Sequence, residues 1–531
     1  MKWNVKEVSG DRAASLYHLS PLSAKLLEAS GLSDEQIREL LEDERDPRYS
    51  KASCVKEAAE RLLMARENHE KVFIGGDYDA DGICSTAIMK NTLDRLGIVN
   101  GYYIPDRFRE GYGLRAETVE AAAAKGYSVI MTVDNGVKAH EALIRAKKLG
   151  MYVIVTDHHQ IDEEIEADIV VHPDYLEPEY ANCSGAGVVL QLAHMLVGNC
   201  ALHVALAAVA AIGDVMPLWK ENRVIVKRGL GLLRQGAVPA LSALLAKNAS
   251  VDEKTVGFQI VPKLNSVGRM NDISNVNTLV PFLLLQDPAA ISRFAAQLHT
   301  VNERRKELSA AMVKKAQELL TGEDFEVIYD PEFHEGLCGL AAGRIAEEEH
   351  KPVLVMAGKD DILRGSGRSV PGFNLFAFFA EGFDELEAFG GHEQAVGLTV
   401  RKEDYENFRT EILRKIKETG YVYEEKTGTA VVLQEKDINF AAFTELDRLK
   451  PYPKELSDLY FALVKPEVSD YKKGPKVTKY TFRSGKASLD GVLFPWKGME
   501  ASETPELVCG NLSVNRWRDR ITLQMEIEYL Q

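Results

Sequence analysis

Three aspartates stand at alternate positions directly after an apolar run. The run 72–74 predicts a buried strand, and Asp77, Asp79 and Asp81 follow it inside the glycine-flanked stretch 75–82. Alternate residues of an extended segment share one face, so these carboxylates should converge on one small volume. Carboxylates that close repel one another unless a cation lies between them. Ligands of this kind favour Mg²⁺ or Mn²⁺, although Asp and Gly are also ordinary turn residues.

Three further apolar runs end in acidic or imidazole side chains. Run 128–133 is followed by Asp134, run 152–156 by Asp157, His158 and His159, and the alanine-rich run 202–212 by Gly213 and Asp214. Parallel strands of a doubly wound α/β domain meet at their carboxyl ends, which is the edge where ligands bind. If these runs are strands, their polar tips share that edge and supply enough ligands for two metal ions. Two metal ions a few ångströms apart are a common device for the attack of water on phosphate.

These residues resemble the DHH phosphoesterase superfamily, in which the triplet corresponding to residues 157–159 is the name-giving motif. Within it the chain is most similar to the RecJ family of exonucleases, which are specific for single-stranded DNA. The likeness covers roughly residues 20–425. Its further segments are 103–107, 110–114, 262–270, 365–369 and 390–392. The resemblance implies an α/β protein with a DHH phosphoesterase domain containing a parallel sheet, a long linking helix, a DHH-associated α/β domain and a C-terminal β-rich, OB-like domain.

The order of the motifs implies a ligand set for two ions. Asp77 and Asp79 would hold one metal ion. The other would be held by Asp81, His158 and Asp214, with Asp134 as the bridge between the two ions. Mn²⁺ is favoured over Mg²⁺ because imidazole is a softer ligand than oxygen.

The resemblance also implies the catalytic residues and one departure from the superfamily. Asp134 and His158 would act through the metal ions, and His159 would face the scissile phosphate, where it steadies charge or protonates the leaving oxygen. Asp157 would orient the histidines next to it. Many superfamily members have a ligating histidine where this chain has Gly75, so Asp77 would have to complete the first site.

Glycines and arginines are the candidates for gripping the substrate strand. Glycine-rich turns let backbone N–H groups approach a phosphate closely, and arginine adds bidentate hydrogen bonds. Glycine-rich turns alone are weak evidence for phosphate binding, and the resemblance to the RecJ family supports this interpretation. The candidate substrate-binding residues are Arg107, Arg269, Arg344, Arg368, Ser369, Gly390, Gly391 and His392.

The C-terminal part of the chain (426–531), called the tail below, is predicted to be β-rich and contains a basic stretch. Residues 471–486 carry six cations and no acid, with aromatic residues between them. In an OB-fold that binds single strands, rings stack on bases and cations follow the backbone. A solvated basic hairpin explains the same stretch almost equally well. The candidate cations are Lys473, Lys476, Lys479 and Arg483, and Phe494, Trp496 and Trp517 could extend the aromatic platform.

Length and composition are those of a globular protein with several domains. The chain has 531 residues, 45% of them hydrophobic and 27% charged. The net charge of −16 argues against a coat of basic residues, so any DNA contact must be local. The six cysteines form no CxxC pair, which favours reduced thiols. With no apolar leader and no membrane-spanning run, we expect a cytoplasmic protein that does not contact membranes.

We expect five parts along the chain. They are an N-terminal helical segment (1–70), the DHH metal-site domain (71–222), a helical connector (223–325), the DHH-associated substrate-binding domain (326–425) and the OB-like domain (426–531). In the connector, Asp287 and Pro288 predict the N-cap and first turn of a long helix, for which Gly322 offers a C-cap.

The function implied by the resemblance is two-metal hydrolysis of phosphodiester bonds in single-stranded DNA, with mononucleotides released from the 5′ end, in DNA repair or recombination. Only the resemblance indicates this polarity. A phosphodiesterase for short oligonucleotides or cyclic dinucleotides is one alternative, against which the basic tail and the helical connector argue. A catalytically inactive scaffold of a replication or repair complex is the other, and the presence of the acidic and imidazole ligands disfavours it. The implied partners are single-stranded DNA and a single-strand-binding protein, with the chain itself monomeric.

Overall fold

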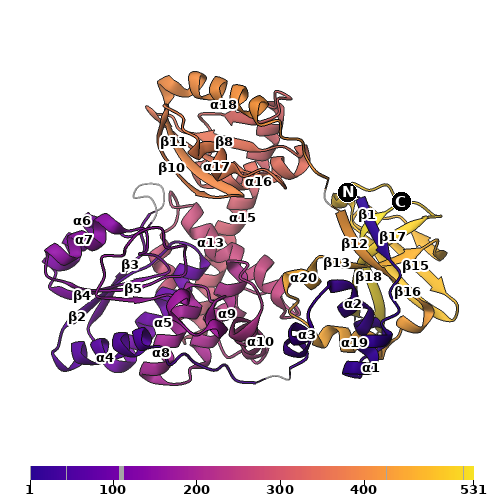
Figure 1. Cartoon of the computed structure of the whole chain (residues 1–531), viewed down its shortest axis with the longest axis horizontal. Coiled ribbons are helices and arrows are strands. Elements are labelled where there is room, and N and C mark those ends of the chain that lie inside the picture. The colour runs from indigo at the N-terminus through magenta and orange to yellow at the C-terminus, as the bar shows by residue number, and fades with distance from the viewer. Residues whose placement is uncertain (1, 43–44, 107–112, 426, 518–519) are drawn as a thin grey trace. The chain divides into compact units, whose positions relative to one another are not determined.

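The computed structural model describes residues 2–42, 45–106, 113–425, 427–517 and 520–531. The chain forms two compact units (Figure 1). Unit 1 consists of Met1–Glu44, Pro217–Trp219 and Glu425–Gln531, and unit 2 of Arg45–Met216 and Lys220–Glu424. The segment 1–70, expected to be one helical part, is therefore divided between the two units. In the described part of the chain, no helix is both long enough and apolar enough to cross a lipid bilayer.

A five-stranded parallel sheet forms the first part of unit 2. Its strands in spatial order are β3 (Asn100–Tyr103), β2 (Lys71–Gly75), β4 (Tyr127–Val133), β5 (Tyr152–Thr156) and β6 (Ile169–Val171). The strand order reverses at β2, because the chain adds β3 on one side of β2 and then β4 on the other. Ligands of open α/β sheets bind at such a switch point, outside the carboxyl ends of the strands. The predicted parallel sheet is thus confirmed.

Helices surround this sheet and carry part of the predicted site. They are α4 (Ser53–Glu67), α5 (Ala80–Leu96), α6 (Ala116–Ala124), α7 (His140–Lys148), α8 (Gly185–Val197), α9 (Ala201–Gly213) and α10 (Lys220–Arg234). The expectation that run 202–212 is a strand like the others was wrong, since it forms α9. Alanine has the highest helix propensity, and an apolar run of this length suits a buried helix as well as a strand.

The three aspartates after β2 are also not on one extended segment, as the alternate spacing had suggested. Asp79 is the N-cap of α5, and its side chain accepts hydrogen bonds from the backbone N–H groups of Asp81 and Gly82. Asp81 lies in the first turn of α5. Capping of the helix by Asp79 therefore replaces strand geometry as the reason why these carboxylates lie close together.

The connector is helical, as predicted. It contains α11 (Pro239–Ser242), α12 (Glu253–Thr255), α13 (Val261–Arg269), α14 (Leu279–Leu283) and α15 (Pro288–Glu318). Asp287 caps α15 by accepting a hydrogen bond from the Ala290 N–H, with Pro288 in the first turn. At 1.5 Å per residue the helix is about 47 Å long. It ends with Leu319 as C-cap, before Gly322.

A mixed five-stranded sheet forms the last part of unit 2. Its spatial order is β10 (Leu386–His392), β11 (Ala395–Arg401), β9 (Ile362–Arg368), β8 (Val353–Ala357) and β7 (Glu326–Tyr329). Only β7 and β8 are parallel neighbours, and the other pairs are antiparallel. The helices of this part are α16 (Cys338–Glu349), α17 (Leu375–Ala380) and α18 (Tyr405–Thr419). This is the expected second α/β domain.

Unit 1 is built on one eight-stranded sheet. Its order is β1 (Lys2–Lys6), β12 (Thr427–Val432), β13 (Leu459–Val464), β17 (Leu507–Trp517), β18 (Arg520–Leu530), β16 (Ala487–Leu493), β15 (Thr478–Ser484) and β14 (Glu467–Lys472). The N-terminal strand pairs in parallel with β12 (Figure 1). The helices are α1 (Asp11–Tyr17), α2 (Pro21–Ser30), α3 (Asp34–Leu41), α19 (Phe440–Arg448) and α20 (Lys454–Ser457). The tail is β-rich, as predicted, but β1 was not expected.

A buried ion pair joins the N-terminal and C-terminal segments of unit 1. Lys25 Nζ lies 2.6 Å from Asp437 Oδ2, and the two side chains are 1% and 0% exposed. Removing one partner of a buried pair leaves a charge without compensation. In Lys25→Met we therefore expect the free energy of unfolding to fall by about 3–5 kcal/mol, as measured by urea denaturation.

The matched control breaks an exposed pair in the same unit. Arg12 and Asp34 form an ion pair at 2.9 Å with side chains 75% and 52% exposed, so Arg12→Ala should change the unfolding free energy by less than about 1 kcal/mol. Equal losses in Arg12→Ala and Lys25→Met would contradict the importance given to the buried pair.

Candidate active site

The polar residues that follow the strands meet at one edge of the parallel sheet. Asp77 comes two residues after β2, Asp134 directly after β4, and the triplet 157–159 directly after β5. Strands β2, β4 and β5 are consecutive neighbours. Asp134 has a left-handed backbone (φ 60°), and its N–H donates to the carbonyl of Thr156 at 3.0 Å. This bend at the end of β4 turns the chain toward β5 and fixes the position of the Asp134 carboxylate.

Three groups of side chains at this edge are close enough to hold metal ions. They are Asp77, Asp79 and Asp134; Asp81, His158 and Asp214; and Asp134, His158 and His159. Within each group the ligand atoms lie within 4.8 Å of one another. The structure therefore brings together all six residues predicted as metal ligands. Asp134 belongs to two groups, so its carboxylate lies where a bridging ligand would be expected.

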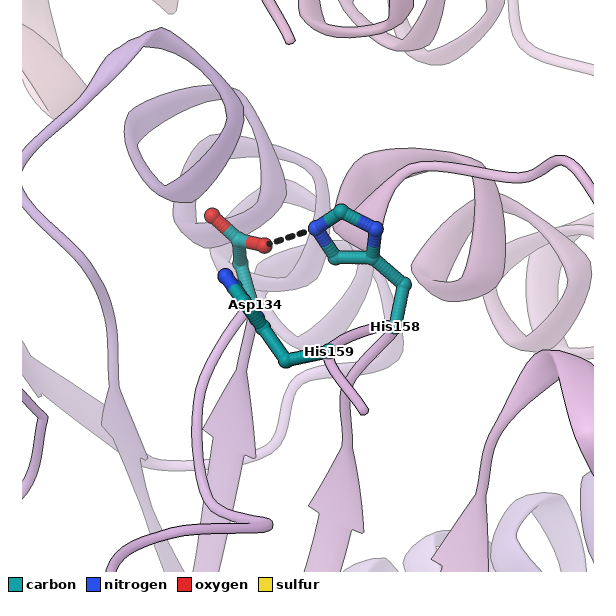
Figure 2. A group of neighbouring side chains, drawn as sticks. All are labelled: Asp134, His158 and His159. Atoms are coloured by element: carbon teal, nitrogen blue, oxygen red, sulfur yellow. Dashed lines mark ion pairs between the residues drawn. The ribbon is translucent and has the colours of Figure 1, made fainter. Parts of the chain in front are cut away.

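His158 lies at the centre of the second group. Its Nε2 is 3.2 Å from Asp134 Oδ1, 3.3 Å from Asp214 Oδ2 and 3.6 Å from Asp81 Oδ2. Figure 2 shows the ring of His158 and the carboxylate of Asp134 pointing toward each other, with the ion pair dashed. An octahedral ion with bonds of about 2.1 Å places adjacent ligands about 3 Å apart, which is close to these separations.

The buried carboxylates of this cluster would be stabilised by a positive charge between them. Burial, and then the neighbouring charges of Asp81 and Asp79, raise the pKa of Asp134 well above its usual value. Burial and the charge of Asp214 raise the pKa of Asp81 to about 7. Burial opposes protonation of His158, but the adjacent carboxylates of Asp214 and Asp81 outweigh burial and raise its pKa to about 9. A divalent cation would offset both the burial and the mutual repulsion that raise the pKa values of these two carboxylates.

Unsatisfied atoms in the cluster fit such a cation. Asp134 Oδ1 and His158 Nε2 are buried, and among the described residues neither atom makes a hydrogen bond. Buried polar atoms in native proteins nearly always have a hydrogen-bonding or metal partner. The donor set of carboxylates with imidazole matches Mn²⁺ or Mg²⁺ chemistry. Residues and geometry thus fit a metal centre.

Asp81 is held in place by the N-terminus of α8. Its Oδ2 accepts a hydrogen bond from the Gly185 N–H at 2.7 Å, and its Oδ1 accepts from the Ala186 N–H at 2.7 Å and from the Ser184 hydroxyl at 3.1 Å. Helix N-termini favour negative charge because their N–H groups are free to donate. These bonds fix the orientation of the fully buried Asp81 carboxylate toward His158.

Asp157 orients His159, the last residue of the triplet. Its Oδ1 lies 2.8 Å from His159 Nδ1 and accepts from the backbone N–H groups of His158 and His159, while its Oδ2 accepts from the Val137 N–H. A carboxylate at Nδ1 places the proton on that nitrogen and leaves Nε2 for other work. The hydrogen bond to His159 also keeps the pKa of Asp157 below its usual value against the effect of burial.

Three family models match the chain, in the order of its parts. They describe the DHH family N-terminal domain at residues 71–213, the DHHA1 domain at residues 322–418 and the RecJ OB domain at residues 429–529. The α/β architecture with a DHH domain, a DHH-associated domain and an OB-like domain is therefore confirmed.

Similarity to known proteins shows the family to which the chain belongs. The single-stranded-DNA-specific exonuclease RecJ of Bacillus subtilis (strain 168) is 32% identical over 558 residues, which cover 99% of this chain and 70% of that protein. The chain belongs to the RecJ family. A crystal structure of RecJ in complex with Mn²⁺ from Thermus thermophilus matches with a TM-score of 0.85 and 25% identity, covering 100% of this chain and 79% of that one. Exonuclease RecJ bound to manganese matches with a TM-score of 0.61 and 30% identity, covering 70% of this chain and 96% of that one.

This RecJ family member has no imidazole in the first metal group. Gly75 ends β2, and a Cβ on it would lie 3.1 Å from a methyl carbon of Leu114. Asp77, only 2% exposed, lies in the group with Asp79 and Asp134 instead. The first group is therefore made of carboxylates, whereas the second contains His158.

Two contacts that hold this RecJ-type site were not predicted. His172 is 3% exposed, and its Nδ1 accepts the Asp174 N–H at 3.2 Å, so its Nε2 carries the proton and donates to the carbonyl of His159 at 2.9 Å. Asn265 Oδ1 accepts the Ala80 N–H at 2.8 Å, which fixes the start of α5. Asn265 lies in the stretch 262–270 noted for its family likeness. His172 follows an apolar run, as the triplet does, and that pattern could have indicated it.

One face of the second sheet collects several of the predicted substrate-binding residues. In the strand register, Ala395 of β11 pairs with both His392 of β10 and Arg368 of β9. Gly397 of β11 likewise pairs with both Gly390 of β10 and Ser366 of β9. Directly opposite residues of neighbouring strands share a face. Arg368, Gly390 and His392 therefore lie on one face of the second sheet. At Gly390 and Gly397 no side chain covers the backbone on that face.

The other predicted substrate-binding residues lie elsewhere. Gly391 has φ 148°, and a Cβ on it would lie 2.2 Å from the carbonyl oxygen of Ala395, so glycine is required there for the hairpin. Ser369 donates its hydroxyl to the Phe373 carbonyl at 2.5 Å. Arg344 lies on an exposed face of α16 and pairs with Glu348 at 2.6 Å. Arg269 is the last residue of α13, and Arg107 lies outside the described residues.

The basic stretch of the tail presents cations, whereas two of its three aromatic rings are buried and the third, Tyr471, is half-buried. Lys479 and Arg483 are exposed on β15, and Lys473 and Lys476 are exposed between β14 and β15. Tyr480 and Phe482, on the opposite face of β15, are 2% and 1% exposed and lie in the core of unit 1. The expectation that these rings stack on bases was wrong, because strand alternation turns them inward. The side chains of Trp496 and Trp517 lie outside the described residues, and Phe494 is half-buried.

Close backbone approach at Gly185 yields a direct test of the metal centre. A Cβ at this first residue of α8 would lie 2.4 Å from Asp134 Oδ1. In Gly185→Ala the carboxylate must move, so we expect the dissociation constant for Mn²⁺ to rise at least about tenfold in calorimetric titration.

The control is a helical glycine with free space around it. Gly231 in α10 has no atom within 4 Å of its would-be Cβ. Gly231→Ala should bind Mn²⁺ as the parent does and gain up to about 1 kcal/mol in stability from helix propensity. Unchanged Mn²⁺ binding in Gly185→Ala would show that the Asp134 carboxylate is not a ligand in this position.

Proposed function

We propose that this chain is a metal-dependent exonuclease that hydrolyses phosphodiester bonds of single-stranded DNA and acts in DNA repair or recombination. One observation carries the proposal: Asp134 and His158 are each shared by two of the three potential metal groups at one edge of the parallel sheet. A site with shared ligands holds two ions close together, which is the arrangement used for cleavage of phosphate esters. The named activity of the RecJ relatives, which act on single-stranded DNA, supports the same conclusion.

The residues of this site would hold two ions, Mn²⁺ or Mg²⁺. Asp77, Asp79 and Asp134 would hold one, and Asp81, His158 and Asp214 the other, with Asp134 between them. When bound, the ions supply charge neutralisation at the phosphate and activation of water. The imidazole of His158 favours Mn²⁺, and RecJ of Thermus thermophilus was solved both with Mn²⁺ and with Mg²⁺.

The chain's own groups then bind and orient the reacting phosphate. Since His159 Nδ1 is hydrogen-bonded to Asp157, its Nε2 is available to steady the charge of the scissile phosphate or to hold the proton for the leaving oxygen. His172 fixes the backbone of His159 from the other side. The helix α8 N-terminus keeps the Asp81 carboxylate oriented, so that the second group stays assembled.

The substrate strand would be held by the face of the second sheet that carries Arg368, Gly390 and His392. Arginine suits phosphate, and bare glycine backbone permits close approach of a nucleotide. The exposed cations of the tail would add contacts to a longer strand, without the base stacking first expected of Tyr480 and Phe482. Attack from the 5′ end, a single-strand-binding protein as partner, a monomeric state and a cytoplasmic location stay predictions from the sequence.

The test of the function uses purified full-length protein with Mn²⁺ and a long single-stranded oligonucleotide labelled at either end. Duplex DNA and a dinucleotide serve as the other substrates. Stepwise shortening of the single strand alone, from the 5′ end, is the expected result. Cleavage of the dinucleotide alone would move the chain to the short-substrate phosphodiesterases, and no cleavage of any substrate would favour the inactive scaffold.

Substitution of the shared carboxylate tests the two-metal arrangement. In Asp134→Asn the negative charge between the two groups is lost. Mutation of a residue that only hydrogen-bonds to a metal ligand typically costs roughly 10–100-fold in activity, so we expect the exonuclease rate of Asp134→Asn to fall by more than that. Asp94→Asn removes an exposed carboxylate that pairs with Lys90 and should leave the rate unchanged. Parent-like turnover of Asp134→Asn would contradict the shared ligand.

The tail cations make a separate prediction about salt. Replacing Lys473, Lys476 and Lys479 by alanine should weaken binding to long single strands. It should also reduce the slope of log affinity against log salt by about 2, since each phosphate contact contributes about 0.7. Lys465→Ala, which removes an exposed cation paired with Glu506, should leave that slope unchanged. An unchanged slope in the triple variant would show that the tail does not bind the strand.

A further inference from the structure

A π-helix interrupts the connector within unit 2. This element, η3 (Val256–Ile260), joins α12 directly to α13. π-Helices are rare in proteins, and most of them are single turns inside α-helices, frequently at functional sites. None of the five side chains of η3 belongs to one of the three metal groups. The element therefore calls for a role other than metal binding.

The π-helix presents a phenylalanine ring to solvent. Phe258 is 75% exposed, whereas Val256 and Ile260, two positions to either side of it, are fully buried. Helix positions two apart do not face the same way, so burial of this pair turns Phe258 outward. Within the described part of the chain, the ring has no aromatic or cationic partner. Most of the surface of Phe258 is thus open to a ligand.

The backbone that carries Phe258 is held in place on both sides. Before the ring, Asp252 caps α12 by accepting a hydrogen bond from the Thr255 N–H at 2.7 Å. After the ring, the side chain of Gln259 accepts the Ala246 N–H at 2.8 Å. A side chain on a fixed backbone loses little conformational entropy when a ligand covers it, so the ring is a preorganised contact.

The π-helix packs against the end of the helix that leads to a metal ligand. A Cβ on Gly257 would lie 3.6 Å from Cγ2 of Ile212 in α9, and Ile212 stands two positions before Asp214. Consecutive Cα atoms are 3.8 Å apart, so the Cα atoms of Phe258 and Asp214 are at most about 20 Å apart along this path. The ring therefore lies within the length of a few nucleotides of the second metal group.

The surface around this contact is apolar, although it adjoins an acidic ligand. Val215 is 86% exposed, and its N–H bonds to the carbonyl of the half-buried Ile212 at 3.3 Å. Val215 and Gly257 thus reach Ile212 from two different elements. Single exposed apolar residues are common on protein surfaces, but here several border the edge of a metal centre.

An unpaired nucleic-acid base is the ligand that fits this surface. Aromatic side chains bind single strands by stacking on bases, largely without regard to sequence. A base of a single strand has a free face, whereas a base inside a duplex must first be unstacked at a cost in free energy. A ring at this position would therefore bind single strands in preference to duplex.

We propose that Phe258 is a substrate-binding residue: its exposed ring, bordered by Ile212 and Val215, stacks on a base of the single strand close to the metal centre. The inference rests on the proposed function. It adds a base contact to the phosphate contacts of that site and gives a physical reason for selecting single strands.

The test uses the full-length protein with Mn²⁺ and two short single strands of equal length. One strand carries thymine at every position, and the other is abasic throughout. Dissociation constants are measured by fluorescence anisotropy on strands with phosphorothioate linkages, which resist hydrolysis, and kcat and KM on ordinary strands. Phe258→Ala removes the ring, Phe258→Tyr keeps it, and Phe258→Leu keeps only apolar surface. The matched control is Phe440→Ala, which removes a ring that is 49% exposed at the start of α19 in unit 1.

We expect Phe258→Ala to raise the dissociation constant and KM for the thymine strand at least about fivefold, with kcat unchanged, because one stacked base is lost. Binding of the abasic strand, binding of Mn²⁺ and the melting temperature should stay as in the parent. Phe258→Tyr should match the parent, and Phe258→Leu should fall between the parent and Phe258→Ala. Phe440→Ala should match the parent on both strands.

Two results would overturn the inference. Parent-like binding of the thymine strand by Phe258→Ala would show that no base covers the ring. Equal losses on the thymine and abasic strands would show that the ring supports the fold of the site rather than a base.

The proposed function and this inference fail in different ways. A parent that binds the thymine strand without cleaving it would contradict the exonuclease, while weaker binding of that strand alone in Phe258→Ala would still support the base contact. A parent that cleaves the thymine strand, with Phe258→Ala indistinguishable from it, would contradict the base contact alone. A parent that neither binds nor cleaves the strand would contradict both.

Discussion

Mutual repulsion of buried carboxylates is the constraint on which the rest of unit 2 depends. Asp81 and Asp134 are almost fully buried within reach of Asp77, Asp79 and Asp214, and this raises the pKa values of both well above the ordinary range. An arrangement of this kind is costly to fold unless cations occupy it. The parallel sheet, the caps of α5 and α8 and the bend at Asp134 all serve to hold these groups at distances that suit metal ions.

The partners of the cluster explain why the site is built from distant segments. Asp81 accepts hydrogen bonds from the start of α8. His159 donates to Asp157, and its carbonyl accepts from His172. At the start of α5, the Ala80 N–H donates to Asn265 in the connector. Each partner fixes a ligand or the helix end that carries it.

Much of the site was predictable because strand ends of a parallel sheet share an edge, and this placed Asp134 beside His158 without knowledge of the structure. The same reasoning failed for run 202–212, since an apolar run does not distinguish a buried helix from a strand. Tyr480 and Phe482 were misjudged because strict alternation with Lys479 and Arg483 already turns them to the opposite face. His172 acts through its contact with the His159 carbonyl, and only the fold reveals that these two residues lie close together.

The most direct measurement of the central claim is a titration of the metal-free full-length protein with Mn²⁺, followed by electron paramagnetic resonance. A two-metal centre bridged by Asp134 predicts two ions per chain, with a spin-coupled spectrum from ions about 3.5–4 Å apart. A single ion, or two ions with uncoupled spectra, would contradict the shared site.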